Sequence, residues 1–385
     1  MDVIDKKRYK EKAESIIFPI KQMEKKFQNI QKEFFNASRS LAGYNLPEYY
    51  LVYFLLVDLL EFKNLGKFDK VAWSVPIDYK GKVFFIEHRK FGIGVFVQNL
   101  EEDEKDAEEI VKKINGAVKS ARPFYDFIAE QAVMDSQFNI KNYNPKLYDR
   151  FNFLLNLYKE NNKLYIENKG KTKKVSTKES VKIIHLEHEY YEKANWFAIS
   201  CIEAFFSWTE HLFIHIAVIS QNISSGNEVS NLIDAEWKTK FITAIPISSD
   251  KISKIYNDLL LVRQQLRNFV AHGAFGKNGN AFNFHSKAGA VPVMMNYKTN
   301  KNRFSLHGTL RFKEEDVIHL IEEFISFLWS DLEPVMYYTQ DCALPTILPF
   351  ASDGFYSSAI ENIETMRVFA HKLISDFDNS ANMDW

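Results

Sequence analysis

The most informative segment of the chain reads Leu261-Val262-Arg263-Gln264-Gln265-Leu266-Arg267-Asn268-Phe269-Val270-Ala271-His272-Gly273. At about 100° per residue, its apolar residues continue one face of a helix that we predict over 249–272. The stripe on this face consists of Ile252, Ile255, Leu259, Val262, Leu266, Phe269 and Val270. Gly273 follows at the position where a left-handed residue commonly ends a helix. The pattern therefore predicts an amphipathic helix that packs in a helical bundle.

Three polar residues of this helix lie off its apolar stripe. Arg267, Asn268 and His272 fall within one arc of about 140°, more than about 100° from the centre of the stripe. Asn268 and His272 are four residues apart, so their side chains can touch. We therefore expect the trio to face solvent or another subunit, and not the core of its own bundle.

An arginine, an amide and a histidine without a carboxylate suit RNA cleavage by attack of the 2′-hydroxyl. Histidine titrates near neutral pH and can act as acid or base. Arginine stays charged, grips phosphate oxygens and stabilises the pentavalent phosphorane. Because one histidine cannot easily serve as base and acid at once, two subunits across a two-fold axis would supply a pair of each residue. We predict Arg267, Asn268 and His272 as catalytic residues.

A basic segment begins on the same helix. Between Leu259 and Lys313 there is no Asp or Glu, and nine basic residues give these 55 residues a charge of +9. The whole chain carries −1, so the remainder carries −1 − 9 = −10. Interleaved aromatic residues make the segment suitable for single-stranded RNA, whose phosphates meet cations and whose bases stack on rings; the alternative is an ordinary hairpin with inward-facing rings. The predicted RNA-binding residues are Arg263, Lys277, Lys287, Lys298, Lys301, Arg303 and Arg311.

Glu210 is an isolated acid in an otherwise apolar helical segment, and a buried acid needs a partner. We predict that it orients Arg267 or Arg263, with a plain surface role as the alternative. The neighbouring His211 and His215 have the spacing of a zincin histidine pair, but Leu212 stands where that motif needs Glu. Neither a metal nor a cofactor is predicted.

The sequence Arg267-Asn268-x-x-x-His272 resembles the motif of HEPN-domain ribonucleases, and the resemblance covers about residues 180–335. It implies a homodimer with a composite, metal-independent site that leaves 2′,3′-cyclic phosphate and 5′-hydroxyl ends. It also implies a role in anti-phage defence by abortive infection, or in toxin-mediated growth arrest, with a sensor or regulatory protein as a further partner. The alternative is a non-catalytic HEPN dimer that senses or binds nucleotide or RNA within a defence complex.

The length of 385 residues predicts two or more domains. Residues 1–170 are predicted as a small α/β domain with a sensor or regulatory role. Residues 171–340 are predicted as a mainly α, HEPN-like bundle with a β-hairpin insertion in 274–312, and 341–385 as a C-terminal helix packed on it. Strands are predicted over 71–77, 83–87 and 93–98, and a lysine-rich linker over 168–174. Helices are predicted over 5–35, 47–63, 101–119, 180–220, 235–245, 313–331 and 353–377, with a loop over 222–231.

The cellular compartment is predicted from the cysteines and from the absence of targeting signals. Cys201 and Cys342 do not make a disulfide framework and fit a reducing compartment. The N-terminus shows no apolar signal segment, and no run of 18 uncharged apolar residues occurs. We predict a cytoplasmic protein without a membrane partner.

Overall fold

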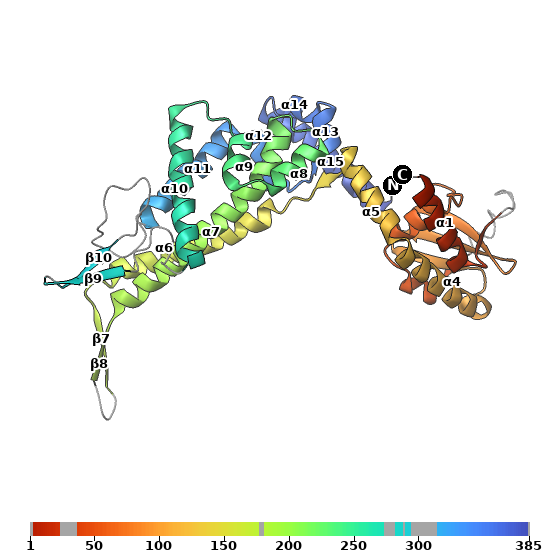
Figure 1. The fold of residues 1–385 in the computed structure, drawn as a ribbon, viewed down its shortest axis with the longest axis horizontal. Helices are drawn as coiled ribbons and strands as arrows, with labels where there is room; N and C mark the ends of the chain where they lie inside the picture. The colour runs from red at the N-terminus through yellow and green to blue at the C-terminus, as the bar shows by residue number, and fades with distance from the viewer. Residues whose placement is uncertain are drawn as a thin grey trace. The chain divides into compact units, whose positions relative to one another are not determined.

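The computed structural model describes residues 3–23, 37–176, 181–272, 282–287, 289–293 and 314–383. The chain is mainly helical, as predicted, with a five-stranded sheet in its N-terminal part (Figure 1). It forms two compact units, of which unit 1 holds Met1–Asp135 and His371–Trp385 and unit 2 holds Ser136–Ala370. This division falls earlier than the predicted border at 170, because α6 (Asn144–Glu167) packs along α7 (Leu186–Ser220) of unit 2.

Unit 1 is built on a sheet with the strand order β1-β3-β4-β5-β2. Its strands are β1 (Lys21–Gln22), β2 (Ser38–Arg39), β3 (Val71–Tyr79), β4 (Lys82–Arg89) and β5 (Gly92–Val97). The three long strands confirm the strands predicted over 71–77, 83–87 and 93–98. Lys80 and Gly81 both have positive φ, the geometry of a two-residue hairpin turn that matches the twist of the strands. All described strand pairs of this sheet are antiparallel, so the predicted α/β domain is an α+β domain.

Helices cover one face of this sheet. They are α1 (Val3–Ile17), a 3-10 helix (Ala42–Asn45), α3 (Tyr49–Tyr53) with its π-helical continuation (Phe54–Leu59) and α4 (Leu100–Ser120). α5 (Arg122–Met134) follows and packs on α4. The core between the two layers contains Leu56, Trp73, Ile77, Val95, Ile110 and Ile114. The helix predicted over 5–35 ends at Ile17, because a residue before a proline, here Pro19, disfavours helical backbone. Residues 24–36 of that prediction lie outside the described residues.

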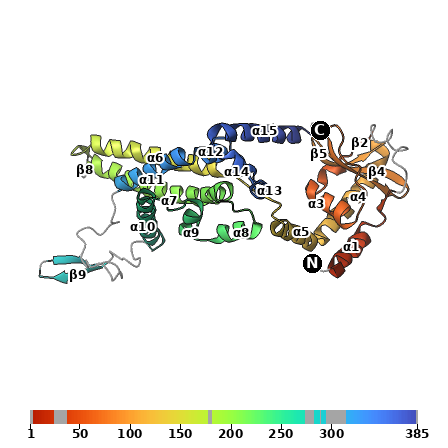
Figure 2. The same cartoon turned by 90° about the horizontal axis from the view of Figure 1, so that it is seen from above.

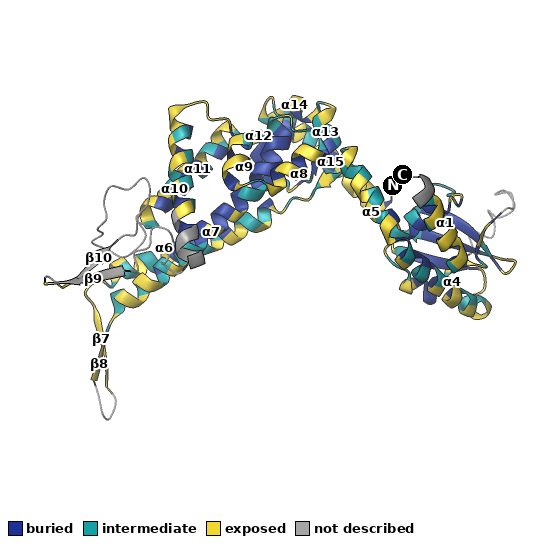
Figure 3. Cartoon of the chain, in the orientation of Figure 1, coloured by how far each residue is buried: buried dark blue, intermediate teal, exposed yellow. Residues whose placement is uncertain are grey.

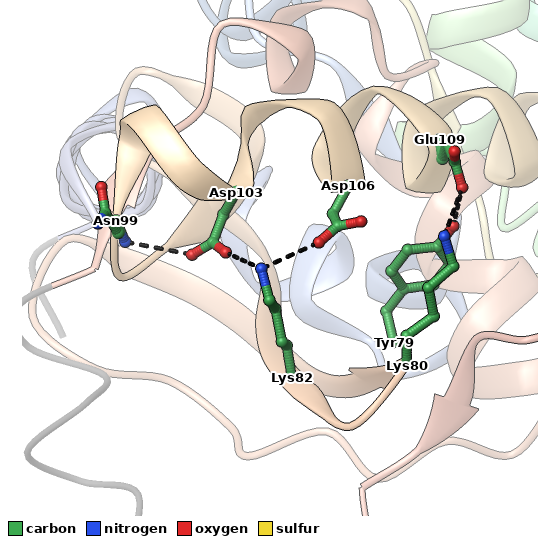
Figure 4. Close-up of polar contacts among 7 residues, drawn as sticks. All are labelled: Tyr79, Lys80, Lys82, Asn99, Asp103, Asp106 and Glu109. Carbon is green, nitrogen blue, oxygen red and sulfur yellow. Dashed lines mark hydrogen bonds and ion pairs between the residues drawn. The ribbon is translucent and has the colours of Figure 1, made fainter.

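Polar contacts hold α4 against the β3–β4 turn (Figure 4). Lys82 Nζ lies 2.7 Å from Asp103 Oδ1 and 3.2 Å from Asp106 Oδ2. Lys80 Nζ lies 3.0 Å from Glu109 Oε2, and the Tyr79 hydroxyl donates to the same carboxylate. Acids along the first half of α4 therefore pair with Lys80 and Lys82, and Asp103, in the first turn, is also favourable near the positive end of the helix.

Unit 2 is a helical bundle around α7, against which α6, α9, α10 and α11 pack (Figures 1 and 2). Its further helices are α8 (Gly226–Asp234), α9 (Trp237–Ala244), α10 (Asp250–His272), α11 (Glu314–Asp331), α12 (Glu333–Met336) with a π-helical continuation (Tyr337–Asp341), α13 (Leu348–Ser352), α14 (Phe355–Ala359) and α15 (Ile363–Asn382). The helices predicted over 235–245, 249–272 and 313–331 are confirmed, with ends that differ by one or two residues. The helix predicted over 180–220 begins only at Leu186, because 181–185 form a strand.

Two predictions for the part of unit 2 that follows α7 are wrong. The loop predicted over 222–231 contains the start of α8, which a reciprocal capping box between Ser225 and Glu228 stabilises. The single helix predicted over 353–377 is divided at 360–362, between α14 and α15, where Asn362 Oδ1 accepts from the N–H groups of Glu364 and Thr365 at the start of α15. α15 begins in unit 2, and its residues from His371 onward belong to unit 1. The segment 341–385 therefore contributes to both units.

The centre of unit 2 is aromatic. Trp208, Phe213, Trp237, Phe241 and Phe324 are all buried. The stripe predicted for α10 is buried at Ile252, Ile255, Leu259, Val262 and Leu266, whereas the side chains of Phe269 and Val270 lie outside the described residues. α7 is long and apolar enough to cross a membrane, but 78% of its most apolar window is buried inside the protein, as is typical of the core helix of a bundle.

In its described residues, unit 2 also contains three antiparallel strand pairs. β6 (Asn139–Ile140) pairs with β11 (Thr346–Ile347), β7 (Thr172–Ser176) with β8 (Val181–His185), and β9 (Phe282–Ser286) with β10 (Gly289–Val293). The β9–β10 pair lies within 274–312, where the sequence predicts a hairpin. The linker predicted over 168–174 is wrong, because β7 begins at Thr172 and forms a second hairpin with β8.

Candidate functional site

The three predicted catalytic residues occupy the last turns of α10, which ends at His272. The helical backbone retains the four-residue spacing of Asn268 and His272, although the side chains of Arg267, Asn268 and His272 lie outside the described residues. Of the predicted RNA-binding residues, Lys287 is exposed in the β9–β10 turn. Lys277, Lys298, Lys301, Arg303 and Arg311 lie outside the described residues.

Arg263 lies one turn before Arg267 and links α10 to α7. Its Nη2 atom is 3.4 Å from Oε2 of Glu210, and Nζ of Lys240 on α9 is 3.0 Å from Oε1 of the same carboxylate. Lys240 is buried and Arg263 is half-buried, so the shared carboxylate compensates two cations that burial would otherwise disfavour. Of the two arginines predicted as partners of Glu210, the structure places Arg263 against it.

The guanidinium of Arg263 also contacts aromatic rings. Its Cζ atom lies 5.8 Å from the ring centroids of both Phe206 and Trp237, within the range of cation–π attraction. Ion pairing and ring contacts together hold Arg263 between α7, α9 and α10. Its contact with RNA stays a prediction, whereas its contacts within the protein make it an anchor for the motif helix.

A cavity of about 610 Å³ lies beside this network. Its polar lining consists of Glu203, Ser207, Glu210, His211, Lys240 and Arg263, and its apolar lining of Leu147, Phe206, Ile214, Ile233 and Leu266. The volume is in the range of small-molecule sites. Leu266 directly precedes Arg267, so the cavity extends to the segment of α10 that carries the motif.

His211 and His215 form a hydrogen-bonded chain behind this cavity. The backbone N–H of Tyr143 donates to His211 Nε2 at 2.9 Å, and His215 Nε2 lies 3.1 Å from that atom. Because His211 Nε2 accepts, the proton of the neutral His215 ring is on Nε2, which donates to His211. Nδ1 of His215 then accepts from the Thr346 hydroxyl, with Oγ1 2.7 Å away. The remaining proton of His211 is then on Nδ1.

Both histidines are held neutral. Burial, with a contribution from the charge of Lys240, lowers the pKa of His211 to about 4. Burial, with a contribution from His211, lowers the pKa of His215 to about 3. The position of this pair beside a cavity was not predicted from the sequence. The four-residue spacing of two histidines beside Glu210 was the signal that could have found it.

Within the described ranges, no group of three or more His, Cys, Asp or Glu residues is arranged to hold a metal ion. Cys201 is buried, and burial raises the pKa of its thiol to about 12, so it is not an activated nucleophile. No known family model, curated protein or solved structure matches this chain.

Proposed function

We propose that the chain is a metal-independent endoribonuclease of the HEPN type. The observation that carries this proposal is the position of Arg267, Asn268 and His272 at the end of one helix, α10, with their helical spacing intact. A charge of +9 over 259–313 supports RNA as the substrate, since phosphate recognition needs local positive charge.

In the proposed reaction, the 2′-hydroxyl oxygen attacks the adjacent phosphorus while a base removes its proton. The bond from phosphorus to the 5′-oxygen breaks, and an acid protonates that oxygen, so the products are a 2′,3′-cyclic phosphate and a 5′-hydroxyl. His272 of one protomer and His272 of its partner serve as base and acid. Arg267 stabilises the phosphorane, and Asn268 orients the substrate.

The network at Glu210 supports this proposal by positioning α10. Catalytic groups need to be held within a fraction of an ångström, and residues on a packed helix meet this need better than residues on a loop. Arg263, one turn before the motif, forms an ion pair with Glu210. Leu266, which lies between Arg263 and Arg267 in the sequence, is buried. The wider proposal, implied by the resemblance, is a role in anti-phage defence or growth arrest in which unit 1 senses a signal.

Cleavage of RNA in the presence of EDTA tests the proposal. We expect the purified full chain to cut tRNA or total RNA, leaving 2′,3′-cyclic phosphate ends. Arg267→Ala and His272→Ala should each lower the rate by about 10²- to 10⁴-fold. Arg122→Ala and His319→Ala, which change exposed residues of the same types elsewhere, should cleave normally. Cleavage retained in both motif variants would contradict the assignment.

The cavity beside α10 favours a second candidate function, a non-catalytic dimer that binds a nucleotide. Its volume of about 610 Å³ would admit a small ligand beside Arg263 and Lys240. Under this alternative the protein would bind a nucleotide at the cavity and leave RNA uncut. Isothermal titration with nucleotides, run in parallel with the cleavage assay, separates the two functions.

A further inference from the structure

The β7–β8 hairpin joins the ends of α6 and α7 and extends away from them (Figure 1). Its register pairs Thr172 with His185 and Ser176 with Val181. Two hydrogen bonds tie its base to the helices: the N–H of Leu186 donates to the Lys171 carbonyl at 3.1 Å, and the N–H of Gly170 donates to the Glu187 carboxylate at 2.6 Å. The hairpin is therefore held at its base by the most extensive helix pair of unit 2.

The hairpin is almost entirely exposed (Figure 3). Every residue of β7 is exposed, and on β8 the side chains of Val181 and Ile183 are 64% and 54% exposed. Among the described residues of β8, Ile184 is half-buried. A two-stranded ribbon with so little packing is marginally stable alone. Its exposed surface is therefore available to a partner, which would also stabilise it.

The charge of the hairpin indicates an anionic partner. Residues 168–186 contain one acid, Glu179, and six lysines, so their net charge is 6 − 1 = +5. The lysines are Lys169, Lys171, Lys173, Lys174, Lys178 and Lys182. Successive residues of a strand point to opposite faces, so Lys173 and Lys174 place charge on both sides of the ribbon. Lysines on exposed strands also oppose edge-to-edge pairing, which disfavours a protein strand as the partner.

Aromatic rings lie where the helices meet the hairpin. Tyr165 of α6 and Tyr191 of α7 have ring centroids 5.4 Å apart, and the Tyr191 side chain is 49% exposed. The Lys193 ammonium, which pairs with Glu189 at 2.7 Å, lies 5.8 Å from the ring of the half-buried Tyr190. The exposed lysines of the hairpin and the exposed ring of Tyr191 together resemble a surface for single-stranded nucleic acid, on which phosphates meet cations and bases stack on rings.

We propose that the β7–β8 hairpin is an arm that binds single-stranded RNA, with phosphates on Lys171, Lys173 and Lys174 and bases stacked on Tyr165 and Tyr191. The inference deepens the proposed ribonuclease function by adding a substrate-binding surface outside the motif helix and outside 259–313. It rests on that function for the choice of RNA, but binding by the arm is measured separately from cleavage.

Fluorescence anisotropy with a labelled 20-nucleotide single-stranded RNA tests the arm. The full chain carrying His272→Ala serves as the parent, so that the RNA stays intact. Changing Lys171, Lys173 and Lys174 together to Gln should raise Kd about tenfold or more at 0.1 M salt. It should also reduce the slope of log Kd against log salt by about 2, the value for loss of three phosphate contacts. Tyr191→Ala should raise Kd about tenfold through lost stacking.

The matched control changes Lys105, Lys112 and Lys119 of α4 to Gln, which removes the same charge from exposed positions of unit 1. Its Kd and salt slope should equal those of the parent. Unchanged RNA affinity in the hairpin triple variant overturns the proposal and would point to a protein partner for the hairpin. An equal loss in both triple variants also overturns it, because the effect would then be one of net charge alone.

Failure of the arm and failure of the nuclease are distinguishable. A chain that leaves 2′,3′-cyclic ends, but whose hairpin triple variant binds RNA normally, refutes the arm and retains the nuclease. A chain that binds RNA through the hairpin but leaves no cyclic ends refutes the nuclease and retains the arm. If the parent shows no RNA binding at all, the arm is refuted as well.

Discussion

The guanidinium of Arg263 lies 3.4 Å from the carboxylate of Glu210, and this contact joins the helix that carries the Arg267–His272 motif to the central helix of unit 2. Lys240 shares the carboxylate from a third helix. Arg263 is one turn from Arg267 on the same helix. We therefore expect a change in the Arg263–Glu210 contact to shift the position of the motif residues. Stability of unit 2 and activity of the motif should therefore respond together to changes at Glu210.

Glu210→Gln removes the carboxylate charge while nearly preserving shape. Lys240, which is buried, then loses its charged partner, and the free energy of unfolding should fall by about 1–3 kcal/mol. RNA cleavage should fall as well, because α10 loses its tie to α7. Urea denaturation followed by tryptophan fluorescence measures the first effect. Glu203→Gln, an exposed change at the same cavity, is the control, and equal denaturation midpoints for the two variants would contradict the prediction.

Thr209→Val tests the hydrogen bond that satisfies a buried indole. Trp237 Nε1 donates to Thr209 Oγ1 at 3.0 Å inside the core, and valine cannot accept this bond. An unsatisfied buried donor costs about 1–3 kcal/mol, which urea denaturation should detect. Thr239→Val on the exposed side of α9 should leave stability nearly unchanged. A Thr209→Val protein as stable as the parent would show that the indole finds another acceptor.

Acidification should destabilise unit 2 through His211 and His215. Their pKa values, about 4 and about 3, lie below the value of about 6.5 expected in the unfolded chain. Their contribution to stability is therefore complete above pH 6.5 and is lost progressively as the pH falls toward 4 and 3. On lowering the pH from 7.5 to 5.5, each histidine should reduce the free energy of unfolding by about 1 kcal/mol, since only the unfolded chain takes up the proton.

Urea midpoints at the two pH values measure this effect, and His215→Gln should reduce the difference between them. His319→Gln, which removes an exposed histidine of α11, should retain the full difference. A difference as large in His215→Gln as in the parent would refute the role of the buried pair.

Dilution should lower the cleavage rate per protomer. The proposed reaction needs a base and an acid, and one protomer supplies one His272, so only the dimer is active. Below the dimer dissociation constant, specific activity should fall with protein concentration. Mass photometry at the same concentrations gives the dimer fraction. Constant specific activity across the transition to monomer would exclude a composite site.

Local patterns predicted much of the fold. Three strands of unit 1 follow from short apolar runs bounded by turn residues such as Gly81 and Gly92. The buried face of α10 follows from residues spaced three and four apart, as at Leu259, Val262 and Leu266. α8 was missed although its capping signal, Ser225 followed by Glu228, is local. β7 was missed because lysines are uncommon in strands, and Lys173 and Lys174 become strand residues by pairing with β8.

The order of residues along the chain determined the amphipathic motif helix and the spacing of Arg267, Asn268 and His272. It also determined the separation of a charge of +9 over 259–313 from a charge of −10 over the rest of the chain. These properties depend on neighbours within a few turns, and periodicity and charge counts report them directly. Tertiary structure decided the partner of Glu210, the cavity beside α10 and the neutral state of His215. The physical reason is distance along the chain: Glu210 and Arg263 are 53 residues apart, and His215 and Thr346 are 131 apart, so packing of the bundle brings them together.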